Sequence, residues 1–171
     1  MDTQKTIFVL CHSVLHKAFR PIVRGELTQQ NFNSCESSKF VINTIIEQQA
    51  ELSENDYFAV TSGKVWESFK EKFLEDKPSK KRAQEVLDIF KNSIKVAGDK
   101  HLKTASLDDS VFIICDILYN LNNYTPILIS NIPSKLNKAE KFYNKKSSNT
   151  IPFKILNTTE AKEYLIKNCK L

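Results

Sequence analysis

The chain has 171 residues, of which 41% are apolar and only three are glycine. This length and composition predict a single domain over residues 1–171 with a full hydrophobic core. The longest apolar run is far shorter than the roughly 20 residues that a transmembrane helix needs, so we expect no membrane span.

The net charge of +5 is concentrated towards the end of the sequence. Residues 124–171 hold nine lysines and three glutamates, whereas residues 1–123 are close to neutral. A basic surface attracts polyanions and acidic proteins through long-range electrostatics. Lysines at helical spacing also occur as an ordinary solvated face, so both interpretations stay open.

Four cysteines are widely spaced along the chain: Cys11, Cys35, Cys115 and Cys169. No CxxC pair occurs, which argues against a zinc ribbon. Most of them lie in apolar or periodic segments, where a buried thiol behaves as a small hydrophobic group. We therefore predict reduced thiols in an intracellular compartment, nuclear or cytoplasmic.

Strand and helix patterns alternate from the start of the sequence. Thr6–Leu10 is a continuous apolar run suited to a strand buried on both faces. Arg20–Ser38 is polar and contains Pro21 and Gly25, which predicts an irregular segment. The next predicted elements are a helix over Phe40–Leu52, a strand over Tyr57–Thr61, a helix over Lys64–Leu74 capped by Ser62, and a helix from Pro78 to Gly98.

The alternation continues in the second half of the chain. Ser106, followed three residues later by Asp109, predicts the start of a helix that runs to about Asn120. The later predicted elements are a strand over Pro126–Ser130, a helix over Ser134–Tyr143, a strand over Pro152–Leu156 and a helix over Thr158–Lys167 capped by Asn157 or Thr158. This order predicts a three-layer α/β/α domain with a mostly parallel central sheet and functional groups at the carboxyl ends of its strands.

Four segments, taken in chain order, resemble the PIN nuclease family. Among its members they most resemble the eukaryotic RNA-surveillance and nuclear PIN endonucleases. They are IFVLCHSVL at 7–15, TSGKVWESF at 61–69, LDDSVFIIC at 107–115 and ILISNIPSKLNKA at 127–139. The resemblance covers nearly the whole chain and implies a PIN-like fold. It also maps the family's acidic positions onto Cys11, Glu67, Asp108 or Asp109, and Ile132.

The resemblance implies a depleted acidic site. PIN nucleases gather carboxylates because Mg²⁺ and Mn²⁺ are hard cations that prefer oxygen ligands. Here Cys11 and Ile132 stand at two positions where the family carries aspartate, and neither a thiol nor an isoleucine is a good ligand for these ions. We therefore expect no cofactor. An alternative interpretation is that Asp108 and Asp109 are first-turn helix carboxylates and that Glu67 is solvated.

The resemblance thus implies a degenerate, catalytically inactive PIN-like domain, a pseudonuclease that binds or scaffolds within an RNA-processing, RNA-decay or ribonucleoprotein complex. We expect a protein partner and, in addition, binding of single-stranded RNA and pairing of two copies into a homodimer. The segments expected to contact a partner are Arg20–Ser38 and Ser147–Thr150. The candidate nucleic-acid-binding residues are the lysines after the third predicted strand: Lys135, Lys138, Lys141, Lys145 and Lys146.

The alternative function is an active endoribonuclease that cleaves single-stranded RNA with Mg²⁺ or Mn²⁺. Its catalytic and metal-binding residues would be Glu67, Asp108 and Asp109. A third class, a nucleotide-binding α/β module, is disfavoured because the sequence has neither GxGxxG nor GxxxxGKS.

A zinc site is a further alternative near the first predicted strand. Cys11, His12 and His16 lie close in sequence, and histidines four residues apart on a helix can share a Zn²⁺ ion. Histidine pairs without a metal are the commoner arrangement, so we expect buried or surface histidines here.

Overall fold

The computed structural model describes residues 5–24, 29–52, 56–75, 80–97, 105–120, 124–131, 134–144 and 153–168. Within these ranges the strands are β1 (Lys5–Leu10), β2 (Ala59–Ser62), β3 (Lys95–Ala97), β4 (Tyr124–Ile129) and β5 (Lys154–Leu156). The helices are α1 (His12–Arg24), α2 (Gln29–Ala50), α3 (Gly63–Glu75), α4 (Lys80–Ser93), α5 (Leu107–Asn120), α6 (Lys135–Asn144) and α7 (Thr158–Asn168). None of these helices is both long and apolar enough to cross a membrane.

The five strands described form one parallel sheet in the order β3-β2-β1-β4-β5. β1 lies in the centre and pairs along its whole length with β4, from Lys5 opposite Tyr124 to Leu10 opposite Ile129. The side chains from Ile7 to Leu10 are all buried. An apolar run without alternation is what a strand covered on both faces requires, so the sequence of β1 fits its central place.

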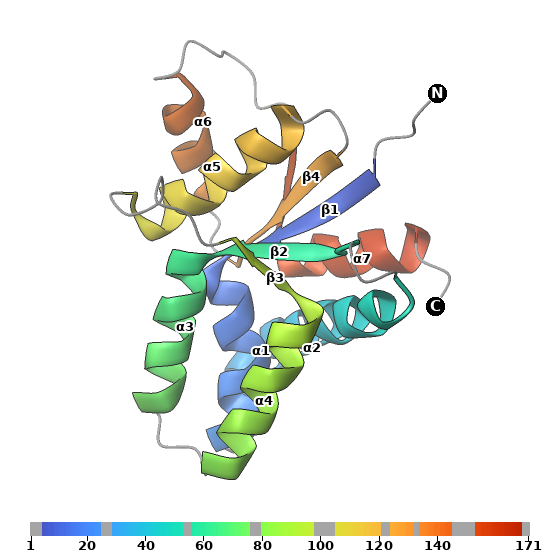
Figure 1. Cartoon of the computed structure of the whole chain (residues 1–171), viewed down its shortest axis with the longest axis vertical. Helices are drawn as coiled ribbons and strands as arrows, with labels where there is room; N and C mark the ends of the chain where they lie inside the picture. The colour runs from blue at the N-terminus through green and yellow to red at the C-terminus, as the bar shows by residue number, and fades with distance from the viewer. Residues whose placement is uncertain are drawn as a thin grey trace.

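Helices cover both faces of the sheet (Figure 1). α5 packs across β4, β2 and β1 on one face, where α6 lies beside it. α1, α2, α4 and α7 gather on the other face, and α3 contacts both α1 and α5. The predicted three-layer α/β/α architecture is confirmed.

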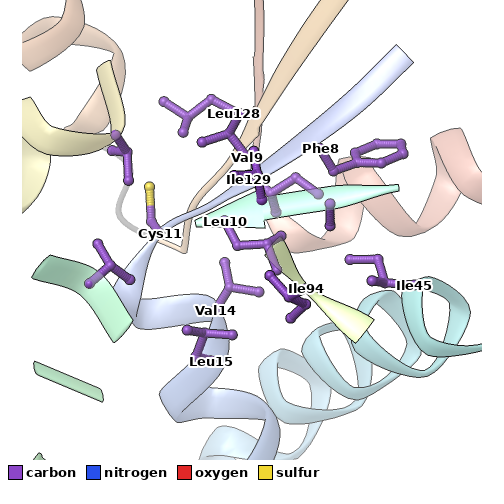
Figure 2. Close-up of a cluster of buried hydrophobic side chains, with 14 of the residues drawn as sticks. Phe8, Val9, Leu10, Cys11, Val14, Leu15, Ile45, Ile94, Leu128 and Ile129 are labelled. Atoms are coloured by element: carbon purple, nitrogen blue, oxygen red, sulfur yellow. The ribbon is translucent and has the colours of Figure 1, made fainter. Parts of the chain in front are cut away.

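The hydrophobic core is built around β1 (Figure 2). It takes side chains from both sheet faces, including Phe8, Leu10, Leu15, Ile45, Ile94 and Leu128. An aromatic extension lies where α3 meets α1. There the fully buried ring of Phe69 stacks on Phe73 at 5.4 Å between centroids, with Trp66 at 5.9 Å. This extension holds α3 at the carboxyl edge of the sheet.

Hydrogen-bonded caps begin three of the helices. Ser62 Oγ accepts a backbone N–H of the first turn of α3 at 3.0 Å, and Ser106 Oγ accepts the Asp109 N–H at 3.1 Å. At α7 the cap is reciprocal, because Glu160 N–H donates to Asn157 Oδ1 at 2.8 Å and Asn157 N–H donates to Glu160 Oε1 at 3.2 Å. The caps predicted at Ser62 and Ser106 are confirmed, and Asn157 is the cap of α7.

Two predictions from the sequence are wrong. Arg20–Ser38 was expected to be irregular, but α1 runs to Arg24 and α2 begins at Gln29. Polar residues and a proline in the last turn of α1 disguise these helices. Lys95–Ala97 was expected to continue a helix, but it forms the strand β3, which pairs with β2. β3 has only three residues and none is buried, so it lacks the apolar run that marks a central strand.

Candidate functional site

The carboxyl ends of β1, β2 and β4 meet at one edge of the sheet, and the chain that leaves them carries most of the predicted site residues. Cys11 follows β1, Ser62 ends β2 and Ser130 follows β4. The chain first adds β2 and β3 on one side of β1, and then adds β4 and β5 on its other side. Parallel sheets bind ligands beyond the carboxyl ends of their strands, at such a switch point. This edge is therefore the candidate site.

Asn131 lies at the switch point and is the centre of a hydrogen-bonded network. Its backbone N–H donates to Ser13 Oγ at 3.2 Å. Its Nδ2 donates to Ser38 Oγ at 3.1 Å and to the Ser13 carbonyl at 3.4 Å, while its Oδ1 accepts from Thr158 Oγ1 at 2.5 Å. The Asn131 amide therefore ties the end of β4 to α1, α2 and α7.

Two buried serines join β2 to α5. The Ser110 hydroxyl donates to the Leu107 carbonyl at 2.7 Å. Since a hydroxyl has one proton, Ser62 is the donor in the 2.7 Å contact between the two serine oxygens. Ser62 Oγ also accepts the cap hydrogen bond of α3. Both hydroxyls are thus used structurally, and they fix the first turn of α5 beside the end of β2.

Two of the predicted acidic residues lie on this first turn of α5. Asp108 and Asp109 are both half-buried. Lys138 Nζ on α6 donates to Asp108 Oδ2 at 2.8 Å, which forms an ion pair between the two helices. Glu67 lies on the exposed side of α3. The structure therefore places Asp108, a predicted acidic site residue, in contact with Lys138, a predicted nucleic-acid-binding residue.

The other predicted positions are distributed as follows. Lys141 is exposed on α6, three residues beyond Lys138, and Lys135 is the first residue of that helix. Positions outside the described residues are Ile132, Lys145, Lys146 and Ser147–Thr150. In the described part of the chain, no three His, Cys, Asp or Glu side chains are arranged to hold a metal ion. Neither the Glu67 set nor the Cys11 and histidine set therefore forms such a group.

Cysteine and histidine side chains lie close together where β1 passes into α1. Cys11 and Cys115 are both buried. The ring centroids of His12 and His16 lie 4.1 Å apart, and His16 meets Phe69 edge-on at 5.4 Å. Burial raises the pKa of the Cys115 thiol well above its ordinary value, and the neighbouring Cys11 and Asp116 add to the rise. Cys115 therefore differs from reactive cysteines, which are accessible and have a lowered pKa.

We expect the Cys115 thiol to make the fold sensitive to alkali. Above its ordinary pKa of 9.0, the unfolded chain loses this proton while the folded chain keeps it, so the free energy of unfolding falls by up to about 1.4 kcal/mol per pH unit. Below that pH both states keep the proton and the effect vanishes. Urea unfolding between pH 7.5 and 10.5 should show a shallower alkaline loss for Cys115→Ala than for the unmodified chain. Parallel pH profiles would contradict this expectation.

No protein-family model matches this chain, and no curated protein or solved structure does either. The likeness to PIN domains stays a prediction from the four sequence segments. The site is thus interpreted from its own geometry.

Proposed function

We propose that this chain is a degenerate, catalytically inactive PIN-like domain that serves as a binding or scaffolding subunit in an RNA-processing, RNA-decay or ribonucleoprotein complex. The observation that carries the proposal is the ion pair between Asp108 and Lys138 at the carboxyl edge of the sheet. A carboxylate that faces a lysine ammonium at 2.8 Å attracts a divalent cation less than a carboxylate in a purely acidic cluster does.

The position of Cys11 supports the loss of catalysis. Cys11 stands where the resemblance implies an aspartate, and its side chain is buried in the apolar core. A thiol that packs inside the fold favours a binding role over metal-dependent cleavage.

The lysines of α6 support contact with RNA. Lys138 and Lys141 are exposed, three residues apart, on a helix that begins beside the carboxyl edge. Residues three apart on a helix are neighbours on its surface. Phosphate contacts need only cations near the path of the backbone, so these two lysines can bind RNA without a catalytic metal.

Neutralising these lysines tests the proposal. Lys138→Gln/Lys141→Gln should weaken binding of a fluorescent single-stranded RNA by about three- to tenfold at low salt, because phosphate contacts dominate such affinities. The matched control is Lys70→Gln/Lys91→Gln, which removes the same charge from exposed positions on α3 and α4, helices that lie away from α6 (Figure 1). Fluorescence anisotropy in EDTA measures both affinities.

Equal losses in the two double variants would show a general charge effect and would contradict a site on α6. Absence of RNA binding by the unmodified chain would overturn the RNA part of the proposal. The same samples with Mg²⁺ or Mn²⁺ test cleavage. RNA cleavage that needs the metal and is lost in Asp109→Asn would replace the proposal with the endoribonuclease alternative.

A further inference from the structure

We infer that Asp108 regulates phosphate binding on α6 by holding Lys138 as an internal counter-ion, a role that rests on the proposed RNA binding. Lys138 Nζ lies 2.8 Å from Asp108 Oδ2, well within the range of a charge-assisted hydrogen bond. A phosphate oxygen that approaches Lys138 must therefore compete with this carboxylate. The affinity of α6 for RNA is set by that competition.

The two partners are held very differently. Asp108 lies on a helix turn that is fixed from three directions: the Ser106 cap, the buried contact between Ser62 and Ser110, and the hydrogen bond from Lys64 Nζ to the Ala105 carbonyl. Its side chain is 27% exposed, whereas that of Lys138 is 51% exposed. Lysine carries a compact charge on a four-carbon stem with many rotamers. The acid is thus the fixed partner and the lysine is the one that can turn away.

This difference predicts that Lys138 exchanges the Asp108 carboxylate for a phosphate when RNA binds. Lys141 is exposed beside the pair and can make the first phosphate contact. Lys138 can then leave Asp108 for a second phosphate, but only at the cost of opening the ion pair. Asp108 therefore weakens binding of any polyanion at this surface. A ligand needs adjacent phosphates, as in an RNA backbone, to offset the cost of opening the pair.

Removal of the Asp108 charge should strengthen RNA binding. We expect Asp108→Asn to bind a single-stranded RNA about two- to fivefold more tightly than Asp109→Asn, which is the range set by one exposed ion pair. The two variants are matched, because each removes one negative charge from the same helix turn. The slope of log affinity against log salt concentration should be the same in the two variants, because Lys138 contacts a phosphate in both complexes and the number of phosphate contacts does not change.

The lysine must account for this gain. In a Lys138→Gln background, Asp108→Asn and Asp109→Asn should show the same affinity and the same salt slope. Anisotropy titrations in EDTA between 50 and 200 mM salt measure both quantities, and circular dichroism confirms that each variant is folded. EDTA keeps any metal-dependent effect of the aspartates out of the measurement.

Failure of this inference is distinct from failure of the proposed function. Equal affinities for Asp108→Asn and Asp109→Asn, with RNA still bound, would overturn the role of Asp108 and leave RNA binding intact. A gain that persists in the Lys138→Gln background would also overturn it, because Lys138 would not be the group released. Absence of RNA binding by every form, including Asp108→Asn, would overturn both.

Discussion

Phe69→Ala should lower the free energy of unfolding by about 3 to 5 kcal/mol. The Phe69 side chain is fully buried between α3 and α1, where it contacts Trp66, Phe73 and His16. Its removal takes away apolar contacts from three rings and leaves a cavity that rigid aromatic neighbours cannot close. Because domains of this kind are stable by only about 5 to 15 kcal/mol, the change is a large fraction of the total.

Urea unfolding followed by circular dichroism measures this loss. The control is Leu74→Ala on the same helix, because Leu74 is 49% exposed and has less buried surface to lose than the fully buried Phe69. Phe69→Leu keeps much of the apolar volume and gives an intermediate value if the alanine variant does not fold. The expected order of destabilisation is Phe69→Ala, then Phe69→Leu, then Leu74→Ala. A Leu74→Ala variant as unstable as Phe69→Ala would refute the assignment of this core.

Asn131→Ala should cost about 2 to 4 kcal/mol, although it removes only a small polar side chain. Asn131 holds the Thr158 hydroxyl, the Ser38 hydroxyl and the Ser13 carbonyl together. Each part-buried group that loses its partner costs about 1 to 3 kcal/mol unless water replaces it. The thermal midpoint should therefore fall by roughly 4 to 16 °C for a chain of this length.

The matched control is Asn137→Ala, which removes the same side chain from an exposed position on α6 and should change stability by less than about 0.5 kcal/mol. Asn131→Asp gives a finer test. A carboxylate can still accept the Thr158 hydrogen bond, but it cannot donate to Ser38 or to the Ser13 carbonyl. It should therefore also be destabilising at neutral pH. Equal midpoints for Asn131→Ala and Asn137→Ala would rule out the network as a source of stability.

The sequence predicts the central elements of this fold well. β1 and β4 are short apolar runs without alternation, a pattern that requires cover on both faces. α3, α5 and α7 combine a capping residue with regular apolar spacing, so their bounds agree with the prediction within about two residues. Patterns of this kind are local, and local physics is sufficient to read them.

The parts that the sequence conceals depend on distant partners. Asn131 reaches Ser38 across 93 residues, and Lys138 reaches Asp108 across 30. Nothing in the neighbourhood of Ser38 or Thr158 marks them as partners of a strand-end asparagine. The resemblance also implies separate roles for Asp108 and Lys138, as an acidic remnant and a phosphate-binding lysine. Only the packing of α5 against α6 brings them together.

The strand order has a consequence for biosynthesis. β1 pairs with β4, so one side of the central strand stays unpaired during synthesis until the ribosome has reached β4, which begins at Tyr124. At ordinary rates of translation this delay is on the order of ten seconds. During that interval the most apolar strand of the described sheet presents unpaired N–H and C=O groups, the kind of edge that recruits other nascent chains. Yield during expression should therefore depend on chaperone supply and on low synthesis rates, more than the compact final fold suggests.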